Sequence, residues 1–144
     1  MGDVDLRRLR REDAAAVARL LGQLGYPAPA DAVERRLDRL LESKADLQLV
    51  AVDGDRVVGL AGLQIGRSLE HDSPVGKLSE LVVDENHRGR GLGKALVQAV
   101  EREARARGCT FLYLTTAHRR KEAHAFYERI GFVETGKRYV KELT

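Results

Sequence analysis

The sequence contains little cysteine and no long apolar run. The single cysteine, Cys109, excludes a disulfide within the chain, which favours a reducing compartment and a role for Cys109 as a small buried side chain. No stretch reaches the roughly 18 consecutive apolar residues of a transmembrane helix, and residues 1–13 lack the apolar segment of a signal peptide. We therefore expect a cytoplasmic protein with no membrane partner.

An excess of charge of one sign is also missing. The 25 Lys and Arg residues nearly balance the 22 Asp and Glu residues, and the two signs are interspersed, so the net charge is only +3. Nucleic-acid binding usually requires basic residues clustered on one face, so we expect no nucleic-acid partner. With 43% hydrophobic residues, a chain of 144 residues can bury one core of its own, and we expect a single domain over residues 1–144.

The N-terminal third predicts a strand and two helices. Alternation of apolar and polar residues predicts a strand over residues 3–9, followed by a helix with Asp13 as its N-cap and Gly25 at its end. Asp31 and Glu34 have the spacing of a capping box ahead of a second apolar stripe. Two helices in succession are expected.

The middle of the chain predicts three strands. Residues 47–65 form two β-rich runs around Asp53-Gly54, a pair that supplies the positive φ angles of a tight hairpin. A polar loop, residues 66–76, leads to the apolar run Leu78–Val83. Because this run does not alternate simply, we expect a central strand that is buried on both faces.

The C-terminal part predicts two more pairs of helix and strand. Their apolar patterns indicate a long helix from Leu92 that ends at Gly108, a strand at 111–114, a helix over 123–130 and a last strand over 132–140. The order is β-α-α-β-β-β-α-β-α-β. We expect a mixed α+β fold with a mostly antiparallel central sheet flanked by helices.

A glycine-rich loop, residues 88–94, lies between the central strand and the long helix. Glycines let the backbone approach a ligand, and the free N–H groups of a helix N-terminus favour a phosphate, to which Arg88, Arg90 and Lys94 add positive charge. The dinucleotide pattern GxGxxG fails because Lys94 stands at its third glycine. The P-loop pattern fails because Arg88 stands where the pattern requires its first glycine. Neither NAD nor ATP is therefore favoured.

The loop resembles the acetyl-CoA signature of the GNAT superfamily of N-acetyltransferases, through Arg88, Gly91 and Gly93. The strand 79–83 before it, the helix after it and residues 123–132 (Ala-His-Ala-Phe-Tyr-Glu-Arg-Ile-Gly-Phe) match further motifs in the same order. The resemblance implies a GNAT-like fold, acetyl-CoA as co-substrate and an amine as acceptor. It assigns cofactor binding to Leu81, Val82, Val83, Arg88, Gly89, Arg90, Gly91, Leu92, Gly93, Lys94 and Phe126.

Two side chains are candidates for acid–base chemistry. Tyr127 occupies the position that protonates the departing thiolate in many relatives, and a phenol with a pKa of about 10 stays protonated at neutral pH. Glu80 precedes the strand residues that the resemblance assigns to the pantetheine arm and faces away from Leu81, so we expect it to act as the base. No pair of the four histidines has a metal-ligand spacing, and no metal is expected.

The acceptor and one cofactor contact stay open at this stage. Many relatives carry an asparagine where this chain has Arg120, which puts that cofactor contact in doubt. The acidic cluster 70–72 would attract a cationic amine, whereas Lys137 and Arg138 would attract an anion. The motifs look somewhat like the small-molecule branch that includes aminoalkylphosphonate acetyltransferases.

A small-molecule primary amine is therefore the expected acceptor. The alternative functions are a protein or peptide N-acetyltransferase and a non-catalytic acyl-CoA sensor. The sequence does not distinguish these functions from acetylation of a small molecule. Unpaired edge strands favour a homodimer.

Overall fold

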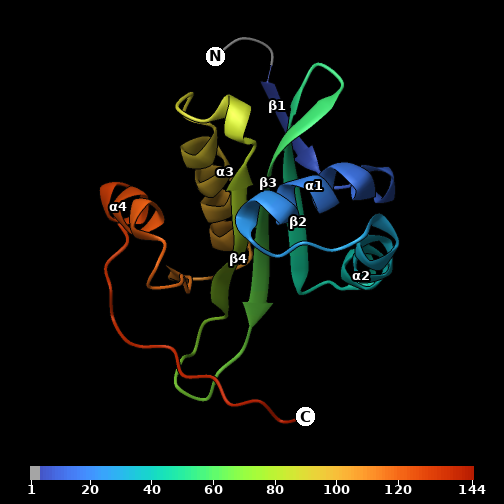
Figure 1. Cartoon of the computed structure of the whole chain (residues 1–144). Coiled ribbons are helices and arrows are strands. Elements are labelled where there is room, and N and C mark those ends of the chain that lie inside the picture. Colours follow the sequence, from blue (N-terminus) through green and yellow to red (C-terminus); the bar gives the residue numbers. More distant parts are fainter. Residues whose placement is uncertain (1–3) are drawn as a thin grey trace. The chain divides into compact units, whose positions relative to one another are not determined.

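The computed structural model describes residues 4–144 and divides the chain into two compact units, Met1–Leu112 and Tyr113–Thr144. Asp3, the first residue of the predicted N-terminal strand, lies outside the described residues. The elements, labelled in Figure 1, are β1 (Val4–Arg8), η1 (Arg11–Asp13), α1 (Ala14–Leu24), α2 (Ala30–Glu42), β2 (Asp46–Asp53), β3 (Arg56–Gly66), β4 (Val75–Val83), η2 (Glu85–His87), α3 (Leu92–Ala106), β5 (Leu112–Tyr113) and α4 (Lys121–Arg129).

The strands form a five-stranded sheet in the order β1-β2-β3-β4-β5, and neighbouring strands from β1 to β4 run antiparallel. The predicted hairpin is confirmed, because β2 and β3 pair on either side of Gly54, whose φ of 65° is left-handed. The predicted strand at 111–114 is present as the two residues of β5, where the units meet along the chain. The mixed α+β class with a mostly antiparallel sheet is confirmed.

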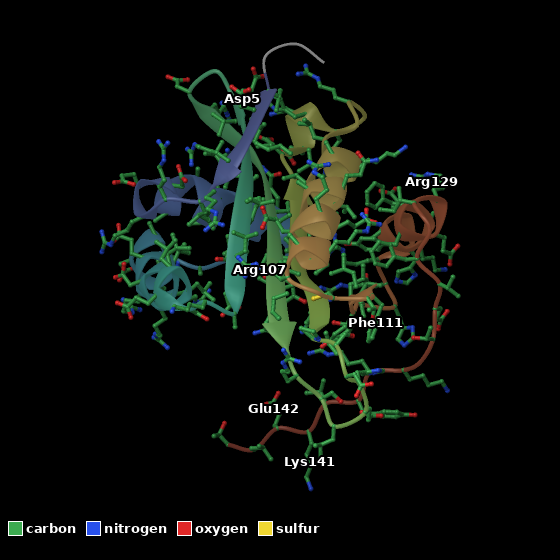
Figure 2. The ribbon with its side chains drawn as sticks, turned by 180° about the vertical axis from the view of Figure 1, so that it is seen from behind. Asp5, Arg107, Phe111, Arg129, Lys141 and Glu142 are labelled. Atoms are coloured by element: carbon green, nitrogen blue, oxygen red, sulfur yellow. The ribbon has the colours of Figure 1, made fainter. Side chains whose placement is uncertain are left out.

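Helices cover both faces of the sheet in the first unit. Helices α1 and α2 pack on one face, and α3 packs on β3 and β4 from the other, as the two opposite views show (Figures 1 and 2). The core on the α1 face consists of apolar residues that are almost fully buried: Leu9, Ala14, Val17, Leu20, Val33, Leu37, Val50, Val57, Leu60 and Val82. Each large side chain of this kind contributes roughly 1.5–3 kcal/mol by leaving water.

A β-bulge interrupts the pairing of β3 with β4. Ala61 pairs with Leu81 and Leu63 with Leu78, so the one residue between them on β3 lies opposite two residues of β4. Ser79 and Glu80 therefore both face Gly62, on the side of the sheet opposite to Leu81. The prediction that this strand is buried on both faces is confirmed at Leu78 and Val82, which are buried on opposite faces, but Leu81 and Val83 are only half-buried.

The two predicted helix caps do not form as the sequence suggests. Asp13 precedes α1, but its carboxylate accepts hydrogen bonds from Arg7 and from the Arg10 N–H instead of capping the helix. Helix α2 starts one residue before Asp31, whose carboxylate pairs with Arg35 along the helix. In both cases an arginine within reach offers the carboxylate a charge-assisted bond, which is stronger than a neutral cap.

The second unit contains α4 and an extended C-terminal segment. Gly131, with a φ of 102°, ends the helix as predicted. The predicted last strand is absent: residues 132–144 are in neither helix nor strand, and Val133, Tyr139, Val140 and Leu143 are exposed. Lys141 and Glu142, labelled in Figure 2, lie on this segment. Strand propensity without a backbone partner is not sufficient to form a strand.

Candidate active site

Glu80 lies in the bulge of β4, next to Gly62 of the neighbouring strand, which has no side chain. A Cβ atom at Gly62 would collide with Ser79 Oγ and Glu80 Oε1, so the two side chains keep their positions only beside a glycine. A glycine in the middle of a strand is a known sign of a bulge or a close approach. This signal was present in the sequence at Gly62, and our sequence analysis missed it.

The surroundings of Glu80 raise its pKa above the usual value of a glutamate. Burial is the largest cause, and the charge of Asp46 acts in the same direction. A hydrogen bond from Ser79 and the charge of Lys77 oppose the increase without cancelling it. A carboxylate with a raised pKa is a stronger proton acceptor at neutral pH than an exposed one.

Polar side chains accompany Glu80 on the same face of the sheet. Gln48 of β2 pairs with Gly62 of β3. Two residues further along β3, Gln64 pairs with Asp46 of β2 on one side and with Lys77 of β4 on the other. Gln48 is buried, with 6% of its surface exposed, although polar side chains at such positions are uncommon. This face therefore changes from the apolar α1 core to a polar surface at Glu80.

The glycine loop adopts the backbone that a phosphate site requires. Gly89 and Gly91 have left-handed φ angles of 80° and 78°, and Gly91 is the N-cap of α3. The first hydrogen bond of the helix runs from the Ala95 N–H to the Gly91 carbonyl at 3.0 Å. The preceding N–H groups, of residues 92–94, therefore point out of the helix end without a partner in the helix, and they can bind an anion.

The predicted cofactor residues of the first unit differ in how far their side chains are exposed. Arg88, Gly89, Arg90, Gly91 and Lys94 are exposed, and Gly93, Leu81 and Val83 are half-buried. Leu92 and Val82 are buried in the core, so only their backbone is available to a ligand. The Arg88 Nε donates to the Val83 carbonyl at 3.2 Å, which directs this arginine along the end of β4.

Tyr127 and Phe126 belong to α4 in the second unit. The Tyr127 ring packs edge-on against Phe126 and Phe132, with centroid distances of 5.4 and 5.6 Å. Burial raises the pKa of the Tyr127 phenol, and the charge of Arg120 acts against this increase. The hydroxyl therefore keeps its proton at neutral pH.

Arg120 and His124 lie near the start of the same helix. Arg120 is the N-cap of α4, and its carbonyl accepts a hydrogen bond from the His124 N–H. The His124 ring donates from Nε2 to the Ala117 carbonyl at 2.8 Å, so this histidine fixes the turn before the helix. It is only half-buried.

The part of the chain that the structure describes lacks a cluster of metal ligands and a membrane-spanning helix. Residues 4–144 contain no cluster of three or more His, Cys, Asp or Glu side chains suited to a metal ion. Among the same residues, no helix is long and apolar enough to cross a bilayer. A shallow depression on α3 is lined only by Gln98, Glu101, Arg102 and Arg105, so no second element contributes chemistry there.

The first unit thus combines an open helix N-terminus after the glycine loop with a carboxylate of raised pKa on the preceding strand. Known proteins are similar to this chain over most of its length. Residues 12–132 match the model of the Acetyltransferase (GNAT) family. The chain belongs to this family, and it is an acetyl-CoA-dependent N-acetyltransferase.

Individual relatives cover nearly the whole chain. The aminoalkylphosphonate N-acetyltransferase of Salmonella typhimurium is 32% identical over 96% of this chain and 91% of that protein. The glucosamine 6-phosphate N-acetyltransferase of Trypanosoma brucei brucei is 31% identical over 90% of this chain and 89% of its own. The crystal structure of a Trypanosoma brucei acetyltransferase superposes with a TM-score of 0.83 at 28% identity, and the match covers 98% of this chain and 100% of the other.

Proposed function

We propose that this protein transfers the acetyl group of acetyl-CoA to the primary amine of a small molecule by direct attack on the thioester. Glu80 is the base, and the observation that supports this role most strongly is its position in a bulge where burial raises its pKa. The amine nitrogen forms a bond to the thioester carbon while its proton passes to Glu80. The carbon–sulfur bond breaks, and the thiolate takes a proton from Tyr127.

Acetyl-CoA supplies the activated acyl group, and this chain supplies the groups that hold it. The loop 88–94, with its exposed Arg88, Arg90 and Lys94, and the N–H groups at the start of α3 are suited to the pyrophosphate. The backbone of residues 81–83 is suited to the pantetheine arm, because an amide-containing chain can pair with a strand. Phe126 lies next to Tyr127 and offers an apolar surface to the same ligand.

The acceptor that we propose is a small amine with a phosphonate or phosphate group. The two relatives described above are named for substrates of this kind. Lys77, which is close enough to Glu80 to lower its pKa, offers a cation for the anionic group while Glu80 receives the ammonium end. Opposite charges at two neighbouring positions favour a zwitterionic ligand.

The test is the release of CoA thiol with a panel of amines. We expect faster turnover with an aminoalkylphosphonate and with glucosamine 6-phosphate than with the corresponding alkylamine and glucosamine. The Lys77→Met variant should raise KM for the anionic acceptors by about tenfold, the effect of one lost charge-assisted contact, and leave the neutral acceptors unchanged. Equal rates with charged and uncharged acceptors would refute this substrate class, and no thiol release with any amine would refute the enzymatic role.

A further inference from the structure

A buried charged cluster lies directly before the glycine loop, and the proposed chemistry does not use it. Its centre is Asp84, the residue after β4, which is only 1% exposed. Arg19 of α1 donates from Nη1 to Asp84 Oδ2 at 2.7 Å, and Arg56 of β3 lies 3.6 Å from the same oxygen. Arg19 and Asp84 are separated by 65 positions in the sequence.

The same cluster fastens the turn that leads to the loop. The Asp84 N–H donates to the Val58 carbonyl at 2.8 Å, and Asp84 Oδ1 accepts from the Asn86 N–H at 3.2 Å. The second Arg19 amino group donates to the Val57 carbonyl at 2.8 Å. The turn that ends at Arg88 is thereby tied to α1 and to the β2–β3 hairpin.

A second side chain of α1 reaches this turn. Gln23 Oε1 accepts from the Glu85 N–H at 2.9 Å. On the hairpin side, His87 Nε2 lies 3.3 Å from Asp53 Oδ2. The residues between Asp84 and Arg88 are thus held from two directions, and the loop that follows starts from a fixed position.

Electrostatics give Arg19 a second effect. Burial by itself raises the pKa of Asp84, but hydrogen bonds from Asn86, Arg19 and Gln23 outweigh it and hold the pKa below its usual value. Asp84 is therefore an anion, four positions before Arg88. Without Arg19, only Arg56 of the two arginines beside Asp84 would remain, 3.6 Å from Asp84 Oδ2, and the less compensated carboxylate would act against an anionic ligand at the loop.

We propose that Arg19 and Asp84 are positioning residues for acetyl-CoA. The ion pair fixes the turn 84–88 so that the glycine loop receives the pyrophosphate, and Arg19 neutralises the Asp84 carboxylate. This inference rests on the proposed location of the pyrophosphate at residues 88–94. A buried ion pair adds little stability compared with well-packed apolar residues, so stability alone does not account for it.

The experiment is a double-mutant cycle on the binding of acetyl-CoA, measured by calorimetry. Arg19→Gln should weaken binding by about tenfold or more because it leaves a buried anion, and Asp84→Asn should weaken it less. The double variant should bind more tightly than Arg19→Gln alone. Arg19→Lys keeps the charge but not the bridge to Val57, and it should be intermediate. At saturating acetyl-CoA, kcat and the acceptor KM should stay within about twofold of the native values.

The chain contains a matched control pair. Arg7 donates to Asp13 at 2.8 and 2.9 Å, and the Asp13 side chain is 8% exposed, so this pair resembles the first in burial and geometry. Arg7→Gln and Asp13→Asn should lower the melting temperature without changing the affinity for acetyl-CoA. The melting temperature of every variant shows whether it folds. If Arg19→Gln does not fold, Asp84→Asn and Arg19→Lys test the inference instead.

The outcomes separate this inference from the proposed site. Gly91→Glu places bulk and negative charge at the N-cap of α3 and should abolish binding. If Gly91→Glu binds normally, the proposed location of the pyrophosphate is wrong, and this inference is wrong with it. If Gly91→Glu abolishes binding but the Arg19 and Asp84 variants bind like the native protein, or no more weakly than the control pair, the inference alone is refuted.

Discussion

Glu80 is a residue on which burial and neighbouring charges act together. Its side chain shares the bulge with Ser79, and its raised pKa has burial as the main cause. A base must be deprotonated to act, so the rate should rise with pH through the pKa of Glu80. Because the pKa of Glu80 is raised, the rate should rise at a pH above about 4.3, the pKa of an unperturbed glutamate.

The Glu80→Gln variant tests this role. We expect kcat to fall by roughly 10²-fold or more, since the base is lost, and the acid limb of the pH profile of kcat/KM to disappear. Ser79→Ala is the companion variant: because Ser79 lowers the pKa of Glu80, its removal should shift the acid limb to higher pH and leave the maximal rate nearly unchanged. An acid limb that persists in Glu80→Gln would assign it to the acceptor amine.

Tyr127 is expected to act in the opposite direction, as an acid. The Tyr127→Phe variant keeps the packing against Phe126 and Phe132 but loses the proton donor. We predict a loss of about 10²-fold in kcat with little change in KM for acetyl-CoA, measured by thiol release. Tyr139→Phe, at a position that is 85% exposed, should have no effect. Equal activities of the two variants would exclude Tyr127 as the acid.

At the scale of elements, the bulge in β4 depends on a glycine in the neighbouring strand. Gly62→Ala would place a Cβ atom on Ser79 Oγ and Glu80 Oε1, which are the free ends of two side chains. These ends can move away at a small cost in stability, but Glu80 then leaves its position. We predict that kcat falls by about tenfold or more while the melting temperature changes little.

Gly22→Ala is the control for this variant. Gly22 lies inside α1, and an added Cβ would meet nothing within 4 Å. Alanine there should stabilise the protein by about 0.5–1 kcal/mol because it favours the helix, and it should leave kcat unchanged. If both glycine variants are fully active, the bulge does not position a catalytic group.

The sequence predicts elements well where the pattern is local. The hairpin at Asp53-Gly54 and the helix that follows the glycine loop depend on turn chemistry and on apolar spacing within a short window, and both are present. The last strand, 132–140, fails because a strand depends on a backbone partner, which the local sequence does not specify. The bulge at Glu80 was missed because alternation was considered within one strand only.

Contacts between residues far apart in the sequence do not follow from local patterns. Arg19 was one charged residue on an amphipathic helix, and Asp84 was one residue after a strand. Only the packing of α1 against the sheet brings them within 2.7 Å of each other. The glycine loop and residues 79–83, by contrast, are short continuous motifs whose chemistry is visible in sequence order, so the sequence alone indicates them as a candidate site.

At the scale of the whole molecule, the balance of charges makes stability depend on a few buried carboxylates and not on the net charge of +3. The pKa of Asp13 is lowered first by its hydrogen bond from Arg7, against the effect of burial, and the pKa of Asp84 is also lowered. A group whose pKa is lower in the folded state stabilises the protein above its unfolded pKa of about 3.9. This contribution is lost as the pH falls through the folded-state pKa.

The contributions of Asp13 and Asp84 to the free energy of unfolding should therefore be constant from neutral pH down to about pH 4 and fall below it. Glu80 acts with the opposite sign, because its pKa is raised, and its cost to stability is relieved as the pH falls through that pKa. Asp13→Asn should cost about 2 kcal/mol at pH 7, the contribution of hydrogen bonds to a charged group, and much less at pH 2. Urea unfolding followed by circular dichroism across this range measures both. Asp31→Asn is the control, because the Asp31 side chain is 72% exposed in its pair with Arg35 and its removal should matter little at either pH. If Asp13→Asn costs as much at pH 2 as at pH 7, the Arg7–Asp13 pair does not lower the pKa of Asp13, and the acid sensitivity of the protein has another source.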